Sequence, residues 1–124
     1  SNRVIFFDET RRELFHSDYH HDAQDSLSCM RIPDTRELVL SGIRIGDVAF
    51  AGFPGEPFTE VGRIIKNGSK YALTMPSCLA NGCEGYYPTQ AAFDEGGYEA
   101  ETAKYVAGTA EKLAAASVEL INSL

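Results

Sequence analysis

The stretch that decides the fold is residues 37–53, "ELVLSGIRIGDVAFAGF", followed directly by residues 54–68, "PGEPFTEVGRIIKNG". The first part contains two apolar runs around Gly46-Asp47, and a glycine in the first turn position predicts a type II′ β-hairpin. Its nearly continuous apolar character predicts strands that are covered on both faces. The second part predicts a helix, with Pro57 at its first position and Asn67-Gly68 at its end.

The sequence after this start predicts a third strand and another helix. Residues 70–80, "KYALTMPSCLA", have the composition of a strand, in which Pro76 indicates a sheet edge or a bulge. Because a helix connects the second strand to the third, we expect these two strands to be parallel neighbours. Residues 89–97, "TQAAFDEGG", predict two turns of helix that end at two glycines.

The last segment, residues 109–124, carries the clearest helical pattern in the chain. Thr109 is the expected N-cap, and one stripe at helical spacing comprises Ala110, Leu113, Ala114, Ser117, Ile121 and Leu124. Together the segments predict a single α/β domain over residues 1–124. This domain would have a small mixed sheet of about three or four strands, helices packed on the sheet and an amphipathic C-terminal helix.

The N-terminal segment, residues 1–36, is assigned only in part. Residues 3–7, "RVIFF", predict a short strand. The segment holds all three histidines of the chain, whose spacing matches no strong metal-binding template. We therefore expect a solvated loop around the cluster, which consists of His16, His20 and His21.

Composition narrows the possible partners and compartments. The formal net charge of −7 argues against nucleic acid or an anionic membrane as a partner. The sequence shows no signal peptide and no apolar run of about 18 residues, which favours a cytoplasmic location. The three cysteines lack a zinc-binding spacing and are expected to be unpaired, partly buried thiols: Cys29, Cys78 and Cys83.

The start of the chain bears on whether the sequence is a whole protein. The chain begins with Ser1-Asn2, and its first methionine is Met30. This pattern fits a piece of a longer protein that follows the remnant of a cleaved tag. It also fits a complete gene product from which the initiating methionine has been removed.

Candidate functional residues follow the ends of the second and third strands. Glu56 lies in "FPGE", and Tyr86 and Tyr87 lie in "LANGCEGYY". Ligand sites in α/β sheets favour the carboxyl ends of strands, so we expect these residues to meet at one sheet edge. Taken alone, they have simpler interpretations, with Glu56 as a charge at a helix start and the tyrosines as anchors of a loop.

Other polar residues are expected to be structural or solvated. Tyr98 alone would be a surface or packing residue. The acidic residues Glu84, Asp94, Glu95, Glu99 and Glu101 predict a solvated acidic face. The sequence contains no phosphate-binding loop, no G-x-S-x-G motif and no H-E-x-x-H motif.

The order of "FPGEPFTEVG" and "CLANGCEGYYPTQAAFDEGGYEAE" resembles the C-terminal part of the catalytic domain of the neutral/alkaline ceramidase family. The resemblance runs from about Leu38 to Leu124, and residues 1–36 carry little of it. It implies that the chain is a C-terminal fragment of a larger ceramidase-like catalytic domain. Such a domain hydrolyses the amide bond of ceramide, or of another N-acyl amide, with a single zinc ion.

The resemblance also implies roles for individual residues. Glu56 and Tyr86 would be zinc ligands, and Tyr98 would hydrogen-bond the substrate carbonyl, while Tyr87 would serve packing. The two zinc-binding histidines of the family have no counterpart in this chain, and His20 and His21 are not expected to replace them. We therefore expect the chain to be inactive by itself and to need the remainder of the parent catalytic domain as its partner.

Two further expectations complete the interpretation. In a competing hypothesis the chain is a stand-alone binding or structural domain, in which the same motif residues only stabilise turns. In addition, a fragment separated from its packing partners would expose apolar surface. A homodimer is therefore expected as well.

Overall fold

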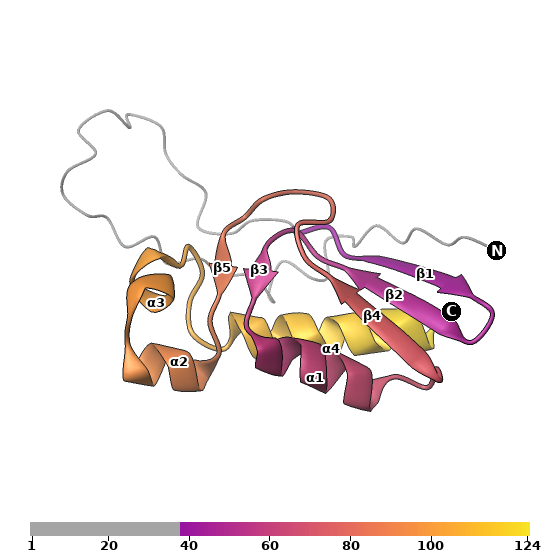
Figure 1. Ribbon diagram of the computed structural model, residues 1–124. Helices are drawn as coiled ribbons and strands as arrows, with labels where there is room; N and C mark the ends of the chain where they lie inside the picture. Colours follow the sequence, from indigo (N-terminus) through magenta and orange to yellow (C-terminus); the bar gives the residue numbers. More distant parts are fainter. Residues whose placement is uncertain (1–37) are drawn as a thin grey trace.

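The computed structural model describes residues 38–124, which form a mixed α/β fold (Figure 1). This confirms the predicted fold class and the C-terminal helix. The predicted strand at residues 3–7, the histidine cluster and Cys29 lie outside the described residues. The elements are β1 (Ser41–Ile45), β2 (Val48–Gly52), β3 (Glu56–Pro57), α1 (Thr59–Gly68), β4 (Leu73–Ser77), β5 (Tyr86–Tyr87), α2 (Gln90–Glu95), α3 (Tyr98–Thr102) and α4 (Thr109–Asn122).

The main sheet has three strands in the order β1-β2-β4. β1 and β2 form the predicted antiparallel hairpin, and β2 pairs in parallel with β4 across the connecting helix, as predicted. Gly46 has a φ of 59°, whereas Asp47 has no positive φ, which is the combination that a type II′ turn requires. Pro76 lies in β4, an edge strand, where its missing N–H is tolerated.

Two helices cover one face of this sheet (Figure 1). α4 packs against β1 and β2, while α1 packs against β4 and against α4. The core between these layers joins Ala49 and Ala51 of β2 to Val61 and Ile65 of α1 and to the inner face of α4. The stripe predicted for the C-terminal helix is buried from Ala110 to Ile121, and Leu124 is half-buried.

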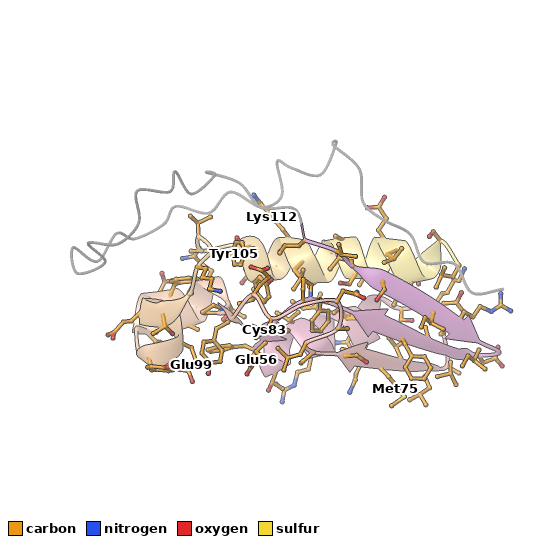
Figure 2. The ribbon with its side chains drawn as sticks, turned by 90° about the horizontal axis from the view of Figure 1, so that it is seen from above. Glu56, Met75, Cys83, Glu99, Tyr105 and Lys112 are labelled. Atoms are coloured by element: carbon orange, nitrogen blue, oxygen red, sulfur yellow. The ribbon has the colours of Figure 1, made fainter. Side chains whose placement is uncertain are left out.

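The opposite face of the sheet, which we call the outer face, is apolar and open. It consists of two rows of register partners, Ile43–Phe50–Met75 and Ile45–Val48–Leu73. Ile45 is 64% exposed and Leu73 is 53% exposed, and Met75 projects away from α4 (Figure 2). For the described residues, the prediction of strands covered on both faces is therefore wrong, because helices lie on only one side.

The short pair of β3 and β5 changes the predicted start of the first helix. Glu56 pairs with Tyr86 and Pro57 with Tyr87 in a parallel arrangement, and α1 begins only at Thr59. The prediction that Glu56 and Pro57 start the helix is thus wrong. A residue before proline disfavours the helical conformation. The backbone N–H of Glu56 also donates to the Gly85 carbonyl at 2.9 Å, which holds this segment extended.

The third strand is shorter than predicted, because β4 ends at Ser77. Residues 78–85 form a loop that folds back onto the segment after β2. The backbone N–H of Ala80 donates to the Phe53 carbonyl, and that of Leu79 donates to the Gly55 carbonyl, both at 3.0 Å. The loop takes the chain from its place beside β2 to its place beside β3.

The helices after β5 agree with the sequence in part. α2 is confirmed, with the Thr89 hydroxyl accepting from the Ala92 N–H at 3.2 Å, whereas α3 was not predicted. The predicted cap of α4 is wrong by one residue, because Gly108, with a φ of 87°, precedes the helix and Thr109 is its first residue. Among residues 38–124 no helix has the length and apolarity needed to cross a bilayer.

Candidate metal site at the β3–β5 pair

The parallel pairing of β3 with β5 brings Glu56 and Tyr86 together. They are direct register partners, so their side chains leave the same face of the two-stranded ladder. Glu56 is exposed and Tyr86 is half-buried. The expectation that a carboxylate and a phenol from successive strand ends meet at one edge is met, although both lie in short strands beyond the main sheet.

The third predicted site residue, Tyr98, lies beside this pair. It is the first residue of α3, and its ring meets the ring of Tyr86 edge to face, with centroids 6.0 Å apart and planes at 72°. Tyr98 is 65% exposed. Glu56 and Glu99 both lie on the side of the molecule away from α4 (Figure 2).

The electrostatics of the site are set by its carboxylates. The negative charge of Glu56 raises the pKa of the Tyr86 phenol above its ordinary value of 10.0. Desolvation raises the pKa further, and so do the charges of Tyr98 and Glu99. The carboxylate of Glu56 therefore favours the protonated phenol at Tyr86.

Tyr87 points to the opposite side and is only 1% exposed. Its hydroxyl donates to the Pro54 carbonyl at 3.0 Å, and its ring stacks on Tyr105 with centroids 5.2 Å apart. The Tyr105 hydroxyl donates to the carboxylate of Glu84 at 2.9 Å. The structure therefore uses Tyr87 for packing, as the sequence interpretation expected.

Close packing explains why position 55 of the Pro-Gly-Glu motif is a glycine. A Cβ atom on Gly55 would lie 2.3 Å from Cε2 of Tyr87 and 2.6 Å from the Gly85 carbonyl oxygen. A side chain at this position is therefore excluded by the close approach of the loop before β5. The packing of Tyr87 and the identity of Gly55 thus depend on each other.

The described residues do not contain a complete metal site. A carboxylate oxygen and a phenol oxygen are suitable zinc donors, but a zinc ion takes about four ligands. Within residues 38–124 there is no histidine and no group of three or more His, Cys, Asp or Glu side chains that could hold a metal ion. Glu56 and Tyr86 carry oxygen atoms of the types that zinc binds, but two donors alone do not complete a zinc site.

Two sequence expectations need correction, one about the acidic residues and one about the cysteines. Glu84 is not part of a solvated acidic face, because it is half-buried and bonded to Tyr105. Glu99 is also half-buried, and its charge acts on Tyr86. Cys78 and Cys83 are free but exposed, rather than partly buried.

Of Glu84 and Glu99, only Glu99 has a sequence pattern from which its position could have been predicted. It follows Gly97-Tyr98 in the pattern of an acidic first turn, which could have predicted α3 and the place of Glu99 next to Tyr98. The partnership of Glu84 with Tyr105 joins residues 21 positions apart and has no local signature.

The fold has counterparts among solved structures. The crystal structure of neutral ceramidase from Pseudomonas aeruginosa matches 73% of this chain with a TM-score of 0.63 and 19% sequence identity. A ceramidase complexed with C2 matches with the same values. Neither the comparison with protein-family models nor the comparison with curated proteins found a match. A sequence identity of 19% shows a similarity of fold and nothing more specific.

The match covers a small part of the larger proteins. This chain spans about 15% of the length of the ceramidases that it matches. The described residues therefore have the fold of a portion of a neutral ceramidase.

Proposed function

We propose that this chain is a fragment of a zinc-dependent amidohydrolase of the neutral ceramidase type, to which it contributes Glu56 and Tyr86 as metal ligands. The observation that carries the proposal is the register pairing of Glu56 with Tyr86, with Tyr98 in contact with the second of them. The ceramidase-like fold of the surrounding residues supports it. The substrate would be ceramide or another N-acyl amide.

Each residue of the site would have a distinct role. Glu56 would supply an exposed carboxylate oxygen as a zinc ligand. Tyr86 would bind the metal as a phenol or as a phenolate. Binding as a phenolate releases the phenolic proton, so the affinity for the metal would then rise with pH. Tyr98, which is exposed and next to Tyr86, would donate a hydrogen bond to the carbonyl oxygen of the substrate.

A zinc ion bound there would polarise the scissile carbonyl and lower the pKa of a bound water to about 7. The chain itself provides two donors, so the remaining ligands and the walls of the substrate pocket would come from the rest of a parent catalytic domain, its proposed partner. The isolated chain would therefore bind zinc weakly and have no hydrolytic activity.

The test combines zinc binding with hydrolysis of an N-acyl amide by a longer protein that includes this segment. Glu56→Ala and Tyr86→Phe should lower the zinc content, and Tyr98→Phe should lower kcat with the zinc content unchanged. Glu119→Ala, an exposed change on α4, is the matched control. If Glu56→Ala and Tyr86→Phe both keep zinc and activity, the assigned roles are wrong.

The second candidate function is a stand-alone binding or structural domain. The tight packing of Gly55 against Tyr87 favours it, since this packing accounts for part of the Pro-Gly-Glu motif without any catalysis. In that case Glu56→Ala and Tyr86→Phe should leave zinc binding unaffected, whereas Gly55→Ala should still destabilise the fold.

A further inference from the structure

Behind the Glu56–Tyr86 pair lie three side chains that the proposed function leaves without a role: Glu84, Tyr87 and Tyr105. Tyr105 lies in the connection between α3 and α4 and is 3% exposed. It stacks on Tyr87 at an interplanar angle of 20° and donates its hydroxyl hydrogen bond to Glu84 at 2.9 Å. A single side chain thus contacts residues on both sides of Tyr86 in the sequence.

The partners of Tyr105 hold the backbone of both short strands. The Pro54 carbonyl accepts from the Tyr87 hydroxyl at 3.0 Å and from the Glu84 N–H at 3.1 Å. The next residue after Glu84 is Gly85, whose carbonyl accepts from the Glu56 N–H at 2.9 Å. These bonds join the turn before Glu56 to the residues that flank Tyr86.

Such support is needed because β3 and β5 have only two residues each. A pair this short is not stable by itself. Metal-binding side chains must be held to within about 0.5 Å by the residues around them.

We propose that Tyr105 is a positioning residue for the Glu56–Tyr86 pair and acts through Glu84 and Tyr87. The inference rests on the proposed function in so far as the pair is taken to bind zinc. Tyr105 precedes α4, which packs on the main sheet. Tyr105 also belongs to the same buried cluster as Ala110 and Leu113 of α4, so it links the two-stranded ladder to the core of the described fold.

The test follows the ring of Tyr86 by NMR in the full chain with ¹³C-labelled tyrosine. Comparison with Tyr86→Phe assigns the resonance. Because the Tyr98 ring meets Tyr86 edge-on at 6.0 Å, the chemical shift of Tyr86 responds to small movements. The variants are Tyr105→Phe, which keeps the stacking and removes the bond to Glu84, together with Glu84→Ala and Glu84→Gln.

We expect the Tyr86 resonance to shift and broaden in Tyr105→Phe and in Glu84→Ala. Glu84→Gln should restore the wild-type resonance, because its amide oxygen can still accept from Tyr105. Tyr71→Phe is the matched control, since the Tyr71 hydroxyl has no hydrogen-bond partner among the described residues. A merely structural role would lower the thermal midpoint and leave the Tyr86 resonance of the folded protein in place.

Zinc titration of a longer protein that includes this segment provides the second readout, because the isolated chain is expected to bind zinc weakly. Loss of a supporting residue behind a metal ligand lowers affinity by about 10-fold or more, so Tyr105→Phe should bind zinc about 10-fold more weakly than Tyr71→Phe. An unchanged Tyr86 resonance in Tyr105→Phe overturns the positioning role, whatever the zinc result. Unchanged zinc binding in Glu56→Ala and Tyr86→Phe would instead overturn the proposed function. Should Tyr105→Phe not fold, the two Glu84 variants decide the question.

Discussion

Two neighbouring tyrosines show how strand geometry separates function from packing at the scale of single residues. Successive side chains of a strand point to opposite faces. Tyr87 is therefore buried against Tyr105, while Tyr86 faces outward beside Glu56. The same phenol group is a core side chain at one position and a candidate ligand at the next.

Glu56→Gln should lower the pKa of Tyr86 towards its ordinary value, because the charge of Glu56 is the largest cause of its increase. The folded-state pKa lies above the unfolded one. Ionisation of the phenol therefore weakens the fold as the pH rises through that value, and Glu56→Gln should reduce this loss. A ¹³C-tyrosine NMR titration measures the pKa. Glu60→Gln, an exposed change on α1, should have no such effect, and an equal decrease in both variants would contradict the prediction.

Gly55→Ala should destabilise the protein by about 1–3 kcal/mol, because the new methyl group would overlap Tyr87 and the Gly85 carbonyl. Urea denaturation measures the loss. Gly62→Ala is the matched control, since its Cβ would meet only Pro76 at 3.9 Å and alanine favours a helix. Equal stability of Gly55→Ala and the wild type would show that the loop adjusts freely.

At the scale of elements, the ends of helices and strands depend on partners distant in sequence. α1 starts late because β5 holds Glu56 and Pro57 extended. At the C-terminal end of α4, the side chain of Asn122 joins this helix to the last residue of α1 and to the segment that follows α1. It donates to the Gly68 carbonyl and accepts from the Lys70 N–H, both at 2.8 Å.

Asn122→Ala should lower the free energy of unfolding by about 1–2 kcal/mol, because two backbone groups lose a partner. Asn122→Asp keeps the acceptor for Lys70 but puts a carboxylate oxygen against the Gly68 carbonyl at the C-terminal end of α4, so it should not recover the stability that Asn122→Ala loses. Chemical denaturation checks both values. The control is Asn67→Ala at an exposed position of α1, and a loss of the same size there would remove the specific role of Asn122.

At the scale of the whole molecule, the outer face is the feature that an isolated domain would be expected to avoid. The two register rows consist of six apolar side chains and contain no charged residue. Exposed apolar patches of this kind mark interaction sites. We propose that a second copy of the chain covers this face in solution.

The double variant Ile45→Lys, Leu73→Lys should convert a concentration-dependent dimer into a monomer, because it introduces charge on both copies of the interface. Sedimentation equilibrium over a range of concentrations measures the mass. Ile64→Lys is the control, since Ile64 is 42% exposed but belongs to α1, away from the outer face. A monomeric wild-type mass at all concentrations would contradict the dimer.

Several parts of the fold follow from local sequence alone. The hairpin depends on Gly46-Asp47 between two apolar runs, α4 on its apolar stripe, and α2 on Thr89 and the glycines after it. These signals act over a few residues, through backbone preferences and periodic side-chain burial. The meeting of the Pro-Gly-Glu motif with Tyr86 at one edge also follows from the predicted strand order. Its interpretation as a metal site comes from the resemblance to ceramidases.

Tertiary structure alone decided the remaining features. Nothing local indicates that residues 78–85 leave the sheet, that Glu84 meets Tyr105, or that one apolar face of the hairpin stays open in the described part of the chain. These outcomes depend on contacts between residues far apart in sequence, where packing and hydrogen bonding outweigh local preference. Glu56 shows the difference most clearly. Its sequence context indicates a helix start, and pairing with Tyr86 makes it part of a strand.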